Sequence, residues 1–380
     1  QKLVVRALAE VSGIEAAVIA HRLMGHWQPS ERFFDRLLSP DTRDADISRP
    51  YPFYLAYPLE GPVEQLGDPA DWQVEWKWDG IRGQLIQRDG QVFVWSRGEE
   101  LVTGTYPELA DAGRRLPDGT AVDGEILAWK NGGPLPFSEL QRRIGRKKVG
   151  KRLLQDVPVI LVAYDLLEDG GSDACSRALQ QRRERLTELL EDVEDPRLRP
   201  SPEIDAHSWS ALAALREEAR SRAAEGFMLK RRSSVYGVGR RRGDWWKWKL
   251  DPFTVDAVMI YAQRGHGRRS GLYTDYTFAV RDGDNLVPFA KAYSGLTDAE
   301  IRRVDRFVQR NTIERFGPVR AVKPELVFEI AFEGIQPSTR HKSGVAVRFP
   351  RISRWRTDKP LEEVDTLDTL KTLLPNRGRP

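Results

Sequence analysis

A lysine followed by an aspartate–glycine turn is the first feature that could do chemistry, and it lies in the stretch EWKWDGIR from Glu75 to Arg82. A lysine amine attacks an electrophile only when it is unprotonated, and a free lysine titrates near about 10.4. Burial or neighbouring positive charge has to lower that value, and Arg82 or a metal ion could supply the charge. An ordinary strand with a surface lysine and a turn has the same pattern, so Lys77 is a candidate nucleophile only.

Two acidic strand ends are the second feature, Asp123-Gly124-Glu125 and Glu225-Gly226. Glu125 lies among apolar residues, which is an unfavourable place for an unpaired carboxylate. Each end alone fits a capped or salt-bridged strand. Together the two glutamates offer the hard oxygen ligands that Mg²⁺ takes besides substrate phosphates.

Cations follow on strand-like segments, in KRR from residue 230, RRR from residue 240 and WKWK from residue 246. The alternation in WKWK predicts that Lys247 and Lys249 share one face of a strand and the two tryptophans share the other. Solvated charged faces are the usual explanation for such runs. Here the lysines follow apolar strands and bulky tryptophans, which favours a cleft that binds phosphate.

Short alternating runs over residues 72–80, 83–90 and 91–98 predict the strands that position these groups, and Asp-Gly turns between them predict hairpins. Two apolar runs, residues 121–130 and 157–168, predict buried strands. Helical spacing predicts helices near 105–116, 138–146, 176–192 and 207–225. The predicted fold class of this part is a large antiparallel α+β domain.

The remainder is rich in strands, which we expect over residues 256–263, 276–283, 286–293 and 325–332, with a helix near 298–310 and another over 361–374. Five or so strands with one helix between them suggest an OB-like barrel of about 125 residues. Near the start, residues 1–27 predict two short helices, and Ser30 is a credible N-cap for a third that ends before Pro40.

Composition bounds the class of protein. The 380 residues are 40% hydrophobic and 31% charged, with a net charge of +4, which excludes a disordered or fibrous chain. A single cysteine, Cys175, excludes a disulfide framework and a cysteine-cluster zinc site, and no apolar run approaches the roughly 18 residues of a membrane span. No P-loop pattern occurs. Because the chain begins at Gln1 without an initiator Met, we expect a fragment of a longer protein.

The motifs also occur in one order: KxDGxR, SRGE (Ser96 to Glu99), DGE, YDLL (Tyr164 to Leu167), EGFMLK, KWK and RFPR (Arg348 to Arg351). This set resembles the covalent nucleotidyltransferase superfamily, and within it the ATP-dependent DNA ligases, over roughly residues 55–359. It is most similar to bacterial ligases with an additional N-terminal DNA-binding domain, most of which we expect to be absent here. The resemblance implies a helical remnant of that domain over 1–50, an adenylation (nucleotidyltransferase) domain with ATP-grasp-like antiparallel sheets over 51–250, and an OB-fold domain over 251–380.

The resemblance also implies roles for individual residues. Lys77 is the adenylated nucleophile, Glu75 holds the adenine edge and Tyr164 stacks on adenine. The other ATP-binding residues are Arg82, Arg97, Glu125, Arg241, Lys247, Lys249, Arg348 and Arg351, of which Arg82 and Arg97 also contact the 5′-phosphate of the nick and the last two orient the pyrophosphate. Glu125 and Glu225 bind the metal ion, Mg²⁺ or Mn²⁺. Arg268 and Arg269, in a basic glycine-rich turn, are candidate DNA contacts, although a plain surface turn fits them equally well. Trp248 departs from the family, where an aliphatic residue is commoner.

The implied activity is sealing of nicks in duplex DNA through a lysyl-AMP and a DNA-adenylate, with ATP bound in a cleft between the two domains and the barrel closing over it. We expect a monomer in the bacterial cytosol or nucleoid, with no membrane contact, acting in DNA replication, repair or recombination. An RNA ligase or an mRNA guanylyltransferase shares KxDGxR and is the nearest alternative. A non-catalytic nucleic-acid-binding protein is disfavoured because every charged motif position is intact, and an NAD⁺-dependent ligase because it needs a four-cysteine zinc finger.

Overall fold

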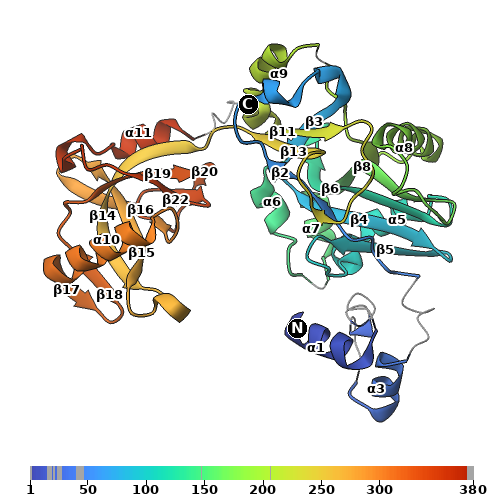
Figure 1. Ribbon diagram of the computed structural model, residues 1–380, viewed down its shortest axis with the longest axis horizontal. Helices are drawn as coiled ribbons and strands as arrows, with labels where there is room; N and C mark the ends of the chain where they lie inside the picture. The colour runs from blue at the N-terminus through green and yellow to red at the C-terminus, as the bar shows by residue number, and fades with distance from the viewer. Residues whose placement is uncertain are drawn as a thin grey trace. The chain divides into compact units, whose positions relative to one another are not determined.

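The computed structural model describes residues 2–14, 19, 22–23, 28–39, 47–146, 148–205 and 207–374, without the side chains of Lys2 and Arg268. Contacts divide the chain into two compact units, Gln1–Leu250 and Asp251–Pro380, each of which is considered by itself. Figure 1 shows the first unit from blue to yellow and the second from yellow to red. None of the described helices is long and apolar enough to cross a membrane.

The first unit begins with helices α1 (Lys2–Ser12) and α3 (Glu31–Leu37). The predicted N-cap is confirmed, because the Ser30 hydroxyl accepts a hydrogen bond from the Phe33 backbone N–H at 3.1 Å. Most of the second helix expected within residues 1–27 lies outside the described residues, as does Pro40. Residues 47–51 are then fixed on the next domain, where Arg88 donates to the Arg49 carbonyl at 2.9 Å and Gln84 bonds both backbone groups of Tyr51 at 2.8 and 2.9 Å.

Two sheets form the body of this unit (Figure 1). The larger is seven-stranded, with the order β10-β8-β6-β4-β5 and the short strands β7 and β9 at its side. Its members are β4 (Ile81–Arg88), β5 (Gln91–Ser96), β6 (Thr120–Lys130), β7 (Gly133–Pro134), β8 (Val159–Asp169), β9 (Ser172–Asp173) and β10 (Leu198–Pro200). Helices α5 (Pro107–Gly113) and α8 (Leu179–Val193) bury leucines against it, while α6 (Phe137–Gln141) and α7 (Lys151–Asp156) connect β7 to β8.

The smaller sheet has four strands in the order β2-β13-β11-β3. They are β2 (Tyr57–Pro58), β13 (Trp245–Lys249), β11 (Ala224–Arg231) and β3 (Trp72–Trp78), and α9 (Trp209–Arg216) packs on their tryptophan face. A two-stranded pair, β1 (Tyr54–Leu55) with β12 (Gly239–Arg240), completes the unit. The pairings of the long strands are antiparallel, but β10 with β8, β13 with β2 and β1 with β12 are parallel.

One expected hairpin is wrong. Asp89-Gly90 joins β4 to β5 in a hairpin with Arg88 opposite Gln91, as the sequence predicts. Asp79-Gly80, in contrast, joins β3 of the four-stranded sheet to β4 of the seven-stranded sheet, so these two strands do not pair. The turn therefore carries the chain from one sheet to the other.

The second unit is a curled antiparallel sheet around β14 (Phe253–Arg264), in the order β16-β15-β14-β18-β17, with β19 pairing β14 and β22. Its other strands are β15 (Tyr273–Asp282), β16 (Asn285–Ala292), β17 (Thr312–Phe316), β18 (Val319–Val322), β19 (Val327–Phe332) and β22 (Arg351–Trp355). A separate antiparallel pair is formed by β20 (Gly334–Pro337) and β21 (Val345–Arg348). The 12-residue β14 bends at two register shifts, which lets it pair with β15 along one edge and with β18 and β19 along the other.

Helices α10 (Asp298–Asn311) and α11 (Leu367–Thr372) close the core of this unit through Val304, Val308, Leu367 and Leu370. Thr297 and Glu300 form a capping box at the start of α10. The helix expected near 298–310 and the four expected strands of this unit are confirmed, whereas the helix expected over 361–374 is α-helical only over Leu367–Thr372. The sequence did not predict β17, β18 or the three strands β20–β22.

Candidate functional site

Lys77 lies on the face of β3 that the aromatic core leaves to polar groups. Residues two apart on a strand point to the same side, so Gln73, Glu75 and Lys77 share this face. Val74 and Trp76 point the other way, into a core that also contains Trp246 and Trp248 of β13. The packed apolar face of β3 therefore fixes the strand that carries Lys77.

The glycine of the KxDG motif is required by a close approach. A Cβ at Gly80 would lie 2.4 Å from the Ile126 carbonyl oxygen and 2.6 Å from a methyl carbon of Leu127, both on β6. The crossover from β3 to β4 thus passes directly against β6, next to Glu125. The fold brings Lys77 close enough to Glu125 for the amine charge to act on that carboxyl.

Glu225 is the ion-pair partner of Lys77. The Lys77 Nζ lies 2.6 Å from the Glu225 Oε2, and the Lys249 Nζ lies 3.4 Å from the same oxygen. β11 carries a β-bulge between Ala224 and Phe227, where Gly226 has φ +131°, and this bulge places Glu225 on the face that carries Lys77. The two acidic strand ends of the sequence therefore meet at the candidate nucleophile.

Lys247, on the strand next to β11, lies among other cations. Burial lowers the pKa of Lys247, and the charges of Lys77, Arg240, Lys249 and Arg97 lower it further. Lys247 and Lys249 share a face of β13, whereas Trp246 and Trp248 pack in the aromatic core, which confirms the predicted alternation. Such a cluster of positive charge is suited to the phosphates of a nucleotide. Arg241, expected to support the lysines, is exposed, and the arginines whose charges act on Lys247 are Arg240 and Arg97.

Glu125 is the titratable group of the site whose pKa comes near neutrality. Burial raises its pKa to about 7, against the opposite influence of Lys77 and Arg82, and the carboxylates of Asp123 and Glu225 raise it as well. A divalent cation or a closer ammonium would favour its ionised form.

Arg82 is one of several hydrogen-bond donors around the buried carboxylate of Asp123. Its guanidinium donates to both Asp123 carboxylate oxygens at 3.2 and 2.6 Å and to the Tyr54 carbonyl at 2.6 Å. Tyr236 donates to Asp123 at 2.6 Å and Tyr164 at 3.3 Å. Since Asp123 is fully buried, this set of donors compensates its charge. The Arg82 guanidinium is therefore engaged by groups of the protein itself. The contact with the nucleotide and the nick that the resemblance implies stays a prediction.

Glu75 is buried and already paired. Its two carboxylate oxygens lie 3.3 and 3.2 Å from the Lys230 Nζ, and Gln73 donates to one of them. The Lys230 ammonium lies 4.0 Å from the centroid of the Tyr164 ring, the residue expected to stack on adenine. Glu75 is only 1% exposed. Its implied contact with the adenine edge stays a prediction.

The remaining candidates belong to the second unit. Arg348 ends β21 and its guanidinium lies 5.0 Å from the Phe349 ring centroid, while Arg351 begins β22 and pairs with Glu333 at 2.8 Å. Arg269 pairs with Asp298 at 2.9 Å on an exposed turn. The Arg268 side chain lies outside the part of the chain that the structure describes.

Glu125 and Glu225 fit a metal ion that arrives with a nucleotide. Within the described residues no three His, Cys, Asp or Glu side chains form a metal cluster. Mg²⁺ commonly uses one or two carboxylates and completes its shell with substrate phosphates and water, so two glutamates among lysines fit that pattern.

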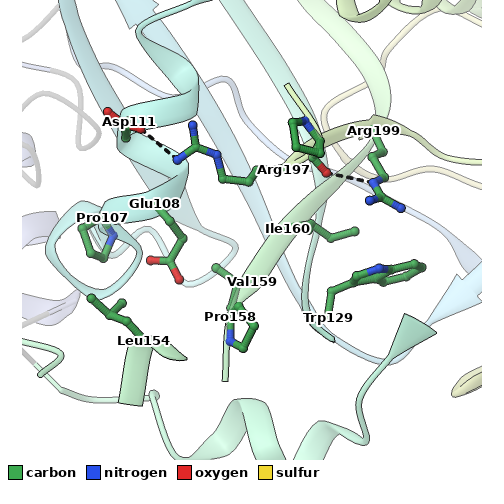
Figure 2. A pocket seen from close by; sticks show the side chains of 11 residues that line it. Pro107, Glu108, Asp111, Trp129, Leu154, Pro158, Val159, Ile160, Arg197 and Arg199 are labelled. Carbon is green, nitrogen blue, oxygen red and sulfur yellow. Dashed lines mark hydrogen bonds and ion pairs between the residues drawn. The ribbon is translucent and has the colours of Figure 1, made fainter. Parts of the chain in front are cut away.

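A separate hollow of about 520 Å³ lies beside α5, α7 and the edge strand β10 (Figure 2). Trp129, Leu154, Val159 and Ile160 line it with apolar surface, and Arg197 pairs with Asp111 at its rim at 2.8 Å. No candidate residue lines it. It therefore contributes nothing to the site around Lys77.

Sequence reasoning missed three members of the site. Lys230 ends the EGFMLK motif. It lies two residues after Met228, so the period of a strand predicts that the Lys230 and Met228 side chains share one face of β11. Asp123 belongs to the DGE motif, but only its neighbour Glu125 was assigned a role. Tyr236 lies in a loop after β11, and nothing in its sequence context indicates that its hydroxyl reaches Asp123.

Residues 54–249 match the family model of the ATP dependent DNA ligase domain, and residues 269–359 match that of the ATP dependent DNA ligase C terminal region. A "Probable DNA ligase" of Koribacter versatilis is 40% identical over 344 residues, which cover 85% of this chain and 60% of the relative. One of Opitutus terrae is 41% identical over 335 residues, 80% of this chain and 33% of the relative. The chain thus spans 60% or less of these two relatives.

Two solved structures share the fold. Pmar-Lig_PreS3 has a TM-score of 0.63 at 16% identity, covering 86% of this chain and 72% of its own. A structure from an analysis of Lig E DNA ligases has a TM-score of 0.57 at 20% identity, covering 81% of this chain and all of its own. They confirm the expected fold, a nucleotidyltransferase domain followed by an OB-fold domain. With the family models matching most of its length, the chain belongs to the ATP-dependent DNA ligase family.

Proposed function

We propose that this chain transfers AMP from ATP to Lys77 and then to the 5′-phosphate of a nick in duplex DNA. The adjoining 3′-hydroxyl then attacks that phosphate, AMP leaves and the strand is sealed. The observation that carries the proposal is the meeting of Lys77, Glu225, Lys247 and Lys249 on one face of the four-stranded sheet. The family models add weight, because both match the chain in the expected order.

In the first step the Lys77 amine attacks the α-phosphorus, an N–P bond forms and the bond to the departing pyrophosphate breaks. Lys77 is paired with Glu225 at 2.6 Å, so the amine has to leave this carboxylate and lose its proton before it attacks. Lys247, Lys249 and Arg97 stabilise the charge on the phosphates, since such transfers depend mostly on positioning and electrostatics. Glu125 and Glu225 would hold Mg²⁺ or Mn²⁺, which would neutralise further phosphate charge.

Other assignments belong to the same proposal. Tyr164 and Glu75 serve the adenine, and Arg82, Arg241, Arg348 and Arg351 serve the nucleotide or its pyrophosphate. Arg268 and Arg269 contact DNA phosphates. We further propose a monomeric enzyme of the bacterial cytosol that acts in replication, repair or recombination, and light scattering of the purified protein tests the monomer.

The test uses ATP labelled at the α-phosphate. With Mg²⁺, label is expected to stay on the wild-type protein in denaturing gels and to be absent from Lys77→Ala. Lys130→Ala is the matched control, because Lys130 is an exposed lysine whose amine donates to the Gln155 carbonyl at 3.2 Å. If Lys77→Ala retains the label, the nucleophile is another residue.

A second assay separates DNA ligation from its alternatives. The labelled protein is offered a 5′-phosphorylated nick in a DNA duplex and in an RNA duplex, and GTP replaces ATP in a parallel reaction. Sealing of the DNA nick with ATP supports the proposal. Preference for the RNA nick indicates an RNA ligase, and labelling by GTP indicates a guanylyltransferase.

A further inference from the structure

Two ion pairs connect β3 and β11, and β3 supplies the acid in one of them and the amine in the other. In the first, Glu75 of β3 lies 3.2 Å from the Lys230 amine of β11. In the second, Lys77 of β3 lies 2.6 Å from the Glu225 carboxylate of β11. Each strand thus carries one acid and one amine on the same face.

The two pairs differ in burial. The side chains of Glu75 and Lys230 are each 1% exposed, whereas those of Lys77 and Glu225 are 21% and 20% exposed. Lys230 also lies 4.7 Å from the centroid of the Trp245 ring and against the ring of Tyr164. The inner pair is therefore enclosed by aromatic rings, and each of its charges compensates the other.

Removal of Lys230 would leave the Glu75 carboxylate buried without its cation. A buried charge that loses its partner is strongly unfavourable, and the protein relaxes by bringing another cation to it. Lys77 lies two residues along the same face of β3, which is about 7 Å by the rise of a strand. Its long flexible side chain can cover that distance.

We propose that Lys230 is a positioning residue for the adenylation of Lys77. By compensating Glu75, it prevents that carboxylate from capturing the Lys77 amine. The amine therefore stays at the Glu225 end of the strand, among the cations that bind the nucleotide phosphates, until it leaves Glu225 to attack. This inference rests on the proposed function, because it assigns Lys230 to a step at Lys77.

The test is a double-mutant cycle with Lys230→Met, Glu75→Gln and the double variant. The rate of lysyl-AMP formation is measured in single turnovers at saturating and at low ATP. Lys230→Met is expected to slow the reaction at saturating ATP by about tenfold or more, since the amine is misplaced even when ATP is bound. The double variant removes both charges, so its rate is expected to return to within about threefold of Glu75→Gln.

Arg143→Met is the matched control for a purely structural effect. It breaks another buried ion pair of the same unit, in which the Arg143 side chain is 0% exposed and its partner Glu108 is 18% exposed. It is expected to lower the unfolding temperature and yet leave the rate per folded molecule unchanged. If Lys230→Met does not fold, Lys230→Gln replaces it, because the amide still bonds to Glu75 but carries no charge.

The outcomes distinguish a failure of the proposed function from a failure of the role of Lys230. If the wild-type protein takes no label, the proposed function itself is wrong. If the wild type takes label and the Lys230 variants take it equally fast, or if Glu75→Gln does not restore them, the role of Lys230 is wrong and the proposed function stands. A crystal structure of Lys230→Met gives a readout that does not depend on activity, and it is expected to show the Lys77 amine within hydrogen-bond distance of Glu75.

Discussion

Replacement of Gly226 by alanine should disturb both the fold and the position of Glu225. Gly226 has φ +131°, which an alanine adopts at a cost of about 1–3 kcal/mol. Its new Cβ would lie 2.3 Å from the Trp248 carbonyl oxygen and 2.8 Å from the Lys249 Cα. Both are backbone atoms, so no side chain can rotate away and β13 has to shift. We expect Gly226→Ala to lose about 3 kcal/mol or more of the free energy of unfolding.

Gly132→Ala separates the two contributions. Gly132 also has a positive φ, +82°, but a Cβ there would meet no atom within 4 Å, so only the backbone strain of about 1 kcal/mol is expected. Urea unfolding followed by tryptophan fluorescence reports on the first unit, because all of the 11 tryptophans except Trp355 lie there. The rate of lysyl-AMP formation is then measured on the folded variants. If Gly226→Ala and Gly132→Ala lose the same free energy of unfolding, the steric overlap expected at Gly226 is wrong. If Gly226→Ala leaves the rate of lysyl-AMP formation unchanged, the role of the bulge in placing Glu225 is wrong.

Three further predictions concern single groups. Burial raises the pKa of Glu125 to about 7 from an unfolded value near 4.3, so the stability that its protonated form contributes is present at low pH and lost as the pH rises through 7. The advantage of Glu125→Gln in urea unfolding with EDTA should therefore grow from pH 5 to pH 8, and a constant difference would contradict the raised pKa. Burial, assisted by Asp173, also raises the pKa of the Cys175 thiol, so its alkylation at pH 8 should be slow in the folded protein and become normal in urea. Arg269→Ala should reduce the slope of log affinity for nicked DNA against log salt by about 1, and an unchanged slope would remove Arg269 from the interface.

Local patterns predicted the parts of the site that depend on a single strand. The faces of WKWK follow from the period of a strand, which holds wherever the strand lies in the fold, and the structure confirms them. The Asp-Gly signal was right at residue 89 and wrong at residue 79, although the two turns have the same residues. The difference comes from a distant contact, because Gly80 packs against the Ile126 carbonyl of β6 and so directs β4 into the other sheet.

The interior of the site could not be predicted in this way. A lysine after an apolar strand is usually solvated, and Lys230 is buried because Tyr164, Trp245 and Glu75 enclose it from three other strands. The position of Arg82 also depends on a long-range contact, because Asp123, the carboxylate with which it pairs, lies 41 residues further along the chain. Long-range pairing decides which polar groups a fold can bury, and a single sequence carries no local signal of it.

In the proposed chemistry the Lys77 ammonium is replaced by a phosphoramidate whose phosphoryl group is anionic, so the carboxylates of the site lose a cation. An adenylated Lys77 is no longer an ammonium, so each carboxylate near it needs another cation or must be protonated. Glu225 has Lys249 at 3.4 Å, and the inner carboxylate, Glu75, has Lys230 at 3.2 Å. Glu125 has a pKa near neutrality and can take up a proton. Each of these three acids therefore has a compensation that does not depend on the Lys77 ammonium.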